Sequence, residues 1–162
     1  MEYKKDTRTK NLTLRDIHVG DWVQVWSEET ERYSPPLKIT QICDDGTVYL
    51  VTDDEERCTP WEENIKDIDA LPIDADLLRG FGFDVIHQAP DEPCIEPYLV
   101  RIDNIRIGEL CLTTLFGVKM WDLHVKKDPF DMEYLKYMHE FVGYMHRYYI
   151  NIKLEWKGLR ND

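Results

Sequence analysis

The most familiar chemical pattern in this sequence lies near its C-terminal end. His139-Glu140 begins like the zinc pattern H-E-x-x-H, in which two imidazoles one helical turn apart bind one ion. Position 143 is Gly, so the second ligand is missing. His146 lies about 10 Å from His139 along a helix, too far to share an ion without ligands from other elements. We therefore predict packed or surface histidines, and no metal ion.

Acidic residues offer oxygen ligands for calcium or magnesium, but their spacing does not match an EF-hand loop. The turn Asp53-Asp54-Glu55-Glu56 and the pairs Asp67/Asp69 and Asp74/Asp76 lack the Gly-centred pattern of an EF-hand. We interpret these residues as solvated loops.

The cysteines form no C-x-x-C pair of the kind that zinc sites use, and we predict small, buried, reduced side chains. They are Cys43, Cys58, Cys94 and Cys111.

Nucleophilic catalysis and nucleotide binding have recognisable patterns, and this sequence contains none of them. No G-x-S-x-G elbow, Walker loop or dinucleotide fingerprint is present, so we predict no cofactor and name no catalytic residue. Distant Cys and His residues can still converge in a fold. A small hydrolase that uses His139 or His146 with nearby carboxylates therefore remains an alternative.

Composition predicts a folded chain with one core or two small cooperating units. The 162 residues are 43% hydrophobic, 12% aromatic and 32% charged. The opening residues 1–10 are polar, unlike a signal peptide, and no run approaches the roughly 20 apolar residues that span a bilayer. We expect a cytoplasmic protein that does not enter a membrane.

Negative charge is concentrated in one region of the chain. Residues 28–76 carry four Lys/Arg against fifteen Asp/Glu, a net charge of −11 out of −12 for the whole chain. A phosphate backbone is bound chiefly by Lys and Arg, so we expect no direct contact with nucleic acid. A basic protein partner fits such a region.

Alternating residues and turns predict a small β unit in the N-terminal half. Asp44-Asp45-Gly46 joins two strands as a hairpin, because Gly supplies the positive φ of a tight turn. About five short strands suit an SH3-like barrel over residues 12–71, after a flexible stretch at 1–11. The predicted strands are Val19–Trp26, Leu37–Cys43, Thr47–Thr52, Arg57–Thr59 and Ile65–Leu71.

The second half reads as an antiparallel sheet packed against one C-terminal helix, which makes the whole chain α+β. A short helical connector capped by Asp74 opens this region, residues 72–162. The Pro-rich segment 89–97 is too polar for a strand. The predicted strands are Phe83–Ile86, Tyr98–Ile102, Ile105–Leu112 and Val118–Leu123, followed by a helix over Met132–Tyr149 capped by Asp131, and an edge strand at Ile150–Trp156.

Three segments resemble an uncharacterised family of short proteins from Bacteroidetes bacteria and their phages or prophages. They are the opening Leu14-to-Val23 with its Gly-Asp-Trp-Val, the connector Leu71-to-Phe83 ending in Gly-Phe-Gly-Phe, and the helix segment Tyr134-to-Val142. After His139-Glu140 this chain continues Phe-Val-Gly, where relatives tend to have Leu-Gln-Asn. The resemblance implies a source among these bacteria and phages, and carries no catalytic residue.

Aromatic side chains cluster in the predicted barrel, where such folds often bind peptides. Burial of one strand face in the core explains the two early tryptophans equally well. We predict a non-enzymatic acidic interaction module that binds a host or phage protein, with an acidic mimic of nucleic acid as a further alternative. The candidate partner-binding residues are Trp22, Trp26, Tyr33, Tyr49, Trp61, Asp53, Asp54, Glu55 and Glu56.

Overall fold

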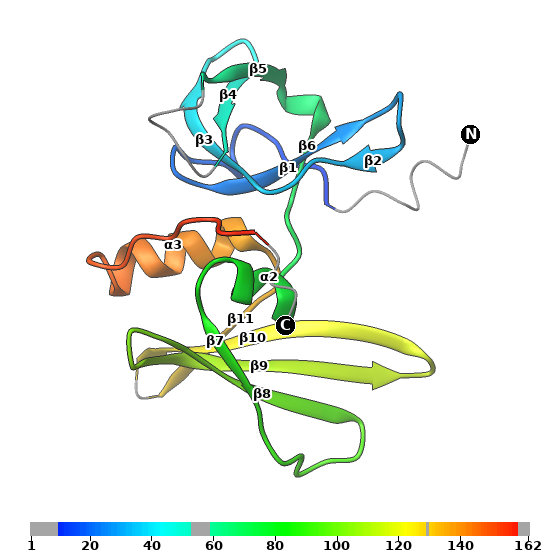
Figure 1. Cartoon of the computed structure of the whole chain (residues 1–162), viewed down its shortest axis with the longest axis vertical. Coiled ribbons are helices and arrows are strands. Elements are labelled where there is room, and N and C mark those ends of the chain that lie inside the picture. Colours follow the sequence, from blue (N-terminus) through cyan, green and yellow to red (C-terminus); the bar gives the residue numbers. More distant parts are fainter. Residues whose placement is uncertain (1–9, 53–58, 129, 159–162) are drawn as a thin grey trace. The chain divides into compact units, whose positions relative to one another are not determined.

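The computed structural model of the chain describes residues 10–52, 59–128 and 130–158 (Figure 1). Contacts divide it into two compact units. The N-terminal unit takes in Met1–Pro72 and Tyr137–Lys153, and the second unit takes in Ile73–Lys136 and Leu154–Asp162. Antiparallel sheets and a C-terminal helix make the fold α+β, as predicted.

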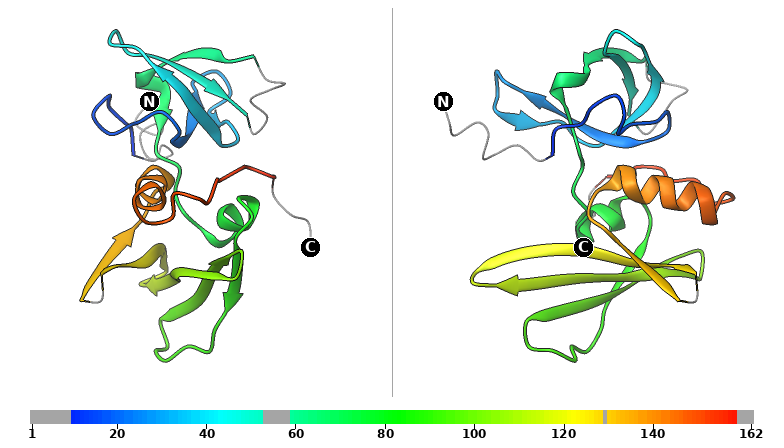
Figure 2. Two further views of the ribbon diagram at one scale, coloured as in Figure 1. Left: turned by 90° about the vertical axis from the view of Figure 1, so that its left-hand side faces the viewer. Right: turned by 180° about the vertical axis from the view of Figure 1, so that it is seen from behind.

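The N-terminal unit is built on one strongly curved antiparallel sheet, a half-barrel (Figure 2). Its strands are β1 Trp22–Ser27, β2 Arg32–Tyr33, β3 Leu37–Ile42, β4 Thr47–Val51, β5 Trp61–Asn64 and β6 Ile68–Asp69, with the 3-10 turn η1 Ile65–Asp67 before β6. They follow the order β2-β1-β3-β4-β5, and β6 also pairs with β1. The interior is apolar and includes Leu12, Val23, Leu37, Ile39, Val48, Leu50 and Ile68.

The predicted hairpin at Asp44-Asp45-Gly46 is confirmed between β3 and β4. Gly46 has a φ of +95°, and the Thr47 amide donates to Asp45 Oδ1 at 3.0 Å. The Cys43 amide donates to the Thr47 carbonyl at 2.8 Å, which closes the turn. Local turn chemistry therefore fixes this pair of strands.

Two predicted strands of this unit are wrong in position. Arg57 and Cys58 lie outside the described residues, Thr59 belongs to no strand, and the strand in this region is β5. The predicted strand Ile65–Leu71 is interrupted by η1, because the Asn64 side chain accepts a hydrogen bond from the Lys66 amide at 3.1 Å. That bond favours a turn over an extended chain.

The second unit contains a five-stranded antiparallel sheet in the order β11-β10-β9-β8-β7. Its strands are β7 Asp84–His87, β8 Ile95–Ile102, β9 Ile105–Leu115, β10 Val118–Asp128 and β11 Asp131–Leu135. Four were predicted, and β8, β9 and β10 extend further than predicted. Residues 95–97, which had been assigned to the polar Pro-rich segment, open β8 by pairing with β9 at Thr113, Leu112 and Cys111.

The short helix α2 Ala75–Gly80 precedes this sheet, and its predicted cap is confirmed. The Leu77 amide donates to Asp74 Oδ1 at 2.7 Å. Gly82, with a φ of +93°, follows the helix end. The connector thus takes the form that its capping residue and glycines predict.

The predicted helix Met132–Tyr149 is wrong in its first third. Asp131–Leu135 is β11, an edge strand paired with β10, and Asp131 caps no helix. The helix α3 covers Met138–Tyr148, and its first turn is fixed by Glu140, whose side chain accepts from the Tyr137 amide at 3.1 Å. Apolar residues spaced at three and four positions predicted a helix. Backbone pairing with β10 instead places residues 131–135 in a strand.

The helix α3 groups with the N-terminal unit, whereas the sequence predicted that it packs on the second sheet. It contacts β1, and the Met138 amide donates to the Leu71 carbonyl at 2.8 Å. Phe141, Val142 and Met145 are buried. Amphipathic spacing predicts that a helix has an apolar face, but it does not identify the sheet that this face covers.

The segment Ile150–Trp156 forms no strand, contrary to prediction. Trp156 instead packs edge-on against Phe81, with ring centroids 5.0 Å apart, and the Lys157 amide donates to the Gly80 carbonyl at 2.8 Å. A Cβ on Gly80 would lie 2.3 Å from the Trp156 ring, so only glycine fits there. Aromatic packing therefore fixes this end of the second unit.

Candidate functional site

The two early tryptophans that were predicted to bind a partner are buried. Trp22 is 2% exposed and Trp26 is 4% exposed. They share one face of β1, while Val23 on the other face points into the half-barrel. Both faces of β1 are therefore core, and these tryptophans are not accessible to a partner in this structure.

Tyr33, a third predicted partner-binding residue, takes part in a polar network within the N-terminal unit. Its hydroxyl donates to Asp69 Oδ2 at 2.6 Å, and Asn11 Nδ2 donates to Asp69 Oδ1 at 3.0 Å. Asp69 is fully buried. These bonds satisfy the buried Asp69 carboxylate and connect Asn11 to β2 and β6. Tyr33 therefore has a structural role in this network.

The remaining predicted aromatics, Tyr49 and Trp61, lie on β4 and β5. Tyr49 pairs with Glu62 across the two strands and is half-buried, and Trp61 is 36% exposed. A hollow of about 270 Å³ is lined by Thr47, Glu62, Glu63 and Asn64. The predicted residues Asp53, Asp54, Glu55 and Glu56 lie outside the described residues.

Strand β5 is the end of the sheet order in this unit, so among the described strands one of its edges has no neighbour. Burial, together with the charge of Asp67, raises the pKa of Glu63. Asp67 therefore adds negative potential at this carboxyl. The exposed edge, the acidic pair Glu62/Glu63 and Trp61 together form what we call the acidic edge.

The two histidines of the alternative hydrolase site, His139 and His146, differ in burial. Burial lowers the pKa of His139, whose Nδ1 atom is buried without a hydrogen-bond partner within the described part of the chain. His146 is exposed. Glu140, which completes the His-Glu pair, serves as a helix cap. In residues 10–52, 59–128 and 130–158, no group of three His, Cys, Asp or Glu side chains is placed to hold a metal ion.

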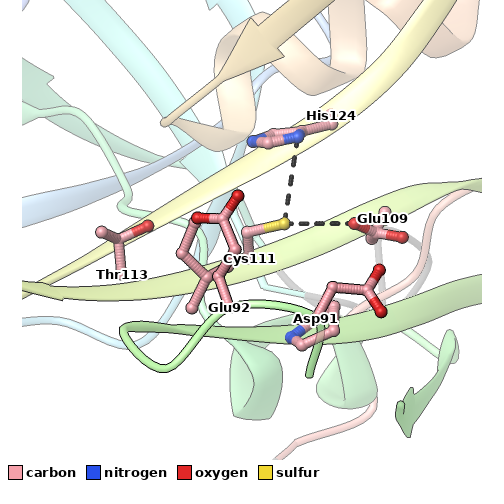
Figure 3. A pocket seen from close by; sticks show the side chains of 8 residues that line it. Asp91, Glu92, Glu109, Cys111, Thr113 and His124 are labelled. Atoms are coloured by element: carbon pink, nitrogen blue, oxygen red, sulfur yellow. Dashed lines mark hydrogen bonds between the residues drawn. The ribbon is translucent and has the colours of Figure 1, made fainter. Parts of the chain in front are cut away.

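A second hollow, of about 220 Å³, lies on the face of the second sheet opposite the buried Leu110 and Leu123 (Figure 3). We call this the outer face, and sequence reasoning did not identify the hollow. The Cys111 thiol donates to Glu109 Oε1 at 3.4 Å, and its sulfur lies 3.9 Å from His124 Nδ1. The residues that line this hollow are Asp91, Glu92, Ile95, Pro97, Glu109, Cys111, Thr113 and His124.

The Cys111 thiol is held in its neutral form. Burial raises its pKa to about 12, and the hydrogen bond to Glu109 and the charges of Glu109 and Asp122 act in the same direction. Cysteine nucleophiles react as thiolates, whose formation requires a positive environment and a lowered pKa. The carboxylates of Glu109 and Asp122 oppose thiolate formation, so the hollow is better suited to binding than to nucleophilic attack.

One signal in the sequence could have located this group. The turn at Phe116-Gly117 fixes the register of β9 and β10, and this register places Glu109 opposite His124 and Cys111 opposite Asp122. Residues directly opposite in an antiparallel pair share a face. Extending the predicted strands outward from this turn would have brought Cys111, Glu109 and His124 together.

Comparison of the chain with protein-family models, curated proteins and solved structures gives no match. Among the described residues, no helix is both long enough and apolar enough to cross a bilayer.

Proposed function

We propose that this chain is a non-enzymatic acidic interaction module that binds a basic segment of another protein at the acidic edge. We also infer that its N-terminal unit is an SH3-like barrel. Support for the barrel comes from β1, which pairs with both β3 and β6 and so joins the start and the end of the unit. From the family resemblance we further propose a host or phage protein as the partner.

The free edge of β5 carries the proposal. An unpaired strand edge offers backbone amides and carbonyls to an incoming extended chain, and neighbouring side chains set its specificity. Here the neighbours are Glu62 and Glu63, with Trp61 beside them. Two like-charged edges repel each other, so this edge disfavours a second copy of itself and favours Lys or Arg.

The chemistry of the side chains also supports binding over catalysis. The neutral thiol of Cys111 is a poor nucleophile, and Glu140 stabilises a helix start. The hydrolase alternative requires a carboxylate that acts with His139 or His146, whereas the neighbouring Glu140 carboxylate accepts from the Tyr137 amide. We therefore favour an interaction module.

A short peptide of alternating lysine and threonine tests this function. Wild-type protein should bind it, while the matched glutamate–threonine peptide should not bind, in titration calorimetry at low salt. Glu62→Lys should weaken binding by roughly tenfold, because a repulsive charge replaces an attractive one. Glu29→Lys, the same charge change at an exposed turn of the same unit, is the control and should have a smaller effect.

A second peptide separates strand addition from simple charge attraction. Methylation of alternate backbone nitrogens keeps every lysine but removes the donors that pair with a strand edge. We expect the methylated peptide to bind much more weakly than the unmodified one. Equal binding of both peptides, or equal loss in Glu62→Lys and Glu29→Lys, would show that the acidic edge is not the binding site.

A further inference from the structure

The outer face of the second sheet carries exposed apolar side chains near the end of the β9–β10 hairpin. Leu115 pairs with Val118, and Thr113 pairs with Met120, so these side chains share the face of Cys111. Leu115, Val118 and Met120 are 49%, 59% and 43% exposed. Together with Phe116 at the turn, we call them the apolar band.

The turn of the β9–β10 hairpin holds a bulky residue, Phe116, in a strained backbone conformation. Phe116 and Gly117 have φ values of +52° and +79°, and a two-residue hairpin turn of this kind favours Asn, Asp or Gly at both positions. A bulky residue at positive φ is strained. Phe116 is fully exposed, at 103%, so packing does not compensate for this strain. Strained positions of this kind concentrate at binding sites.

The hairpin end also extends beyond its neighbouring strands (Figures 1 and 2). Strand β8 pairs with β9 as far as Thr113, and β11 pairs with β10 only from Leu123 onward. Residues 115–118 therefore project past the body of the sheet. An aromatic side chain at this position can enter a cleft on a partner.

The acidic hollow lies on the same face, further along the hairpin. Leu115 lies four positions from Cys111 along β9, which is about 13 Å of extended strand. Asp91, Glu92 and Glu109 line the hollow, and its lining residues include neither Lys nor Arg. The outer face thus presents apolar contacts at one end and negative charge at the other.

We propose that the apolar band and the acidic hollow together dock one amphipathic segment of a partner protein. Charge complementarity fixes its chemistry. Its apolar side chains cover Phe116, Val118 and Met120, and a lysine or arginine enters the hollow beside Glu109. The separation of about 13 Å corresponds to roughly nine residues in a helical segment or four in an extended one. This surface is independent of the acidic edge, since it lies in the other unit.

Selection from a displayed library of random peptides tests the proposal without presupposing a sequence. Wild-type protein should enrich peptides that combine Leu or aromatic residues with Lys or Arg. Purified peptides should then bind Phe116→Asn and Glu109→Gln at least tenfold more weakly in fluorescence anisotropy. Asn suits positive φ, so the first variant should keep or gain stability. Ile105→Asn changes an exposed apolar residue at the other end of β9 and should bind as wild type does.

Several outcomes would overturn this inference. Enrichment of acidic or uncharged peptides, unchanged affinity for Phe116→Asn and Glu109→Gln, or no enrichment over an uncoated support would each exclude the proposed partner. Dimerisation in light scattering that Phe116→Asn abolishes would assign the apolar band to a second copy of the chain. Binding of wild-type protein, but not Phe116→Asn, to neutral lipid vesicles would assign it to a membrane surface. Loss of binding at the acidic edge would leave all these results unaffected.

Discussion

Burial raises the pKa of Asp21 in the N-terminal unit and of Cys111 in the second unit, with different consequences. Cys111 stays neutral across the physiological range because burial raises its pKa to about 12. Burial raises the pKa of Asp21 to about 6, although its side chain accepts from the His18 amide at 2.7 Å. Asp21 is therefore charged and buried at neutral pH, which costs stability.

Asp21 should contribute more stability in acid than at neutral pH. A carboxyl whose pKa is raised from 3.8 to about 6 contributes stability that is present below pH 3.8 and is lost as pH rises through 6. The full effect is about 3 kcal/mol. Asp21→Asn removes the titration but keeps a side-chain oxygen acceptor. In urea unfolding, the unfolding free energy of the variant relative to wild type should rise by up to that amount between pH 3.5 and pH 7.5.

Asp45 provides the matched control for this pH series. The backbone hydrogen bond from Thr47 lowers the pKa of this exposed carboxyl. Asp45→Asn should therefore lose stability relative to wild type as pH rises, which is the opposite sign. A stability difference between Asp21→Asn and wild type that does not change with pH would contradict the role given to Asp21.

At the scale of elements, α3 is the helix whose position matters most. Phe141 is fully buried, and the helix contacts β1 of the N-terminal unit. Phe141→Ala should cost about 3–5 kcal/mol of unfolding free energy. Tyr148→Ala, on the same helix but 44% exposed, should cost about 0.5 kcal/mol or less.

Amide hydrogen exchange identifies the sheet that α3 supports. In Phe141→Ala, amides of β1, β3 and β4 should lose more protection than those of β8, β9 and β10. Preferential loss of protection in the second sheet would instead favour the packing that the sequence predicted.

Much of this architecture follows from local sequence, and the errors occur where distant residues decide the outcome. The Asp44–Gly46 hairpin and the Asp74 cap were predictable, because each is set by neighbouring residues. The strand at Asp131–Leu135 was not, because its pattern fits a helix until the edge of β10 is known. Partner choice for α3 is likewise a tertiary property.

The candidate sites show the same division. The acidity of Glu62 and Glu63 is visible in the sequence, but the burial of Trp22 and Trp26 depends on packing against both faces of β1. The Cys111 hollow required the exact register of a hairpin longer than predicted. The sequence therefore revealed the charges of the acidic edge, but not those that line the Cys111 hollow.

On the scale of the whole molecule, each of the two units carries its own candidate binding surface. Residues 28–76 hold a net −11 of the total −12, and the acidic edge lies among them. The second unit offers the apolar band and a separate acidic hollow. Both surfaces favour positive charge, so each predicts a basic segment in its partner.

Residue-level hydrogen exchange at β5, with and without the lysine–threonine peptide, tests the central claim most directly. Strand addition at the acidic edge should slow exchange of amides within Trp61–Asn64, and the methylated peptide should leave them unchanged. High salt should weaken the effect, because the attraction is electrostatic. Protection that appears elsewhere while β5 amides exchange as in the free protein would contradict the proposed mode of binding.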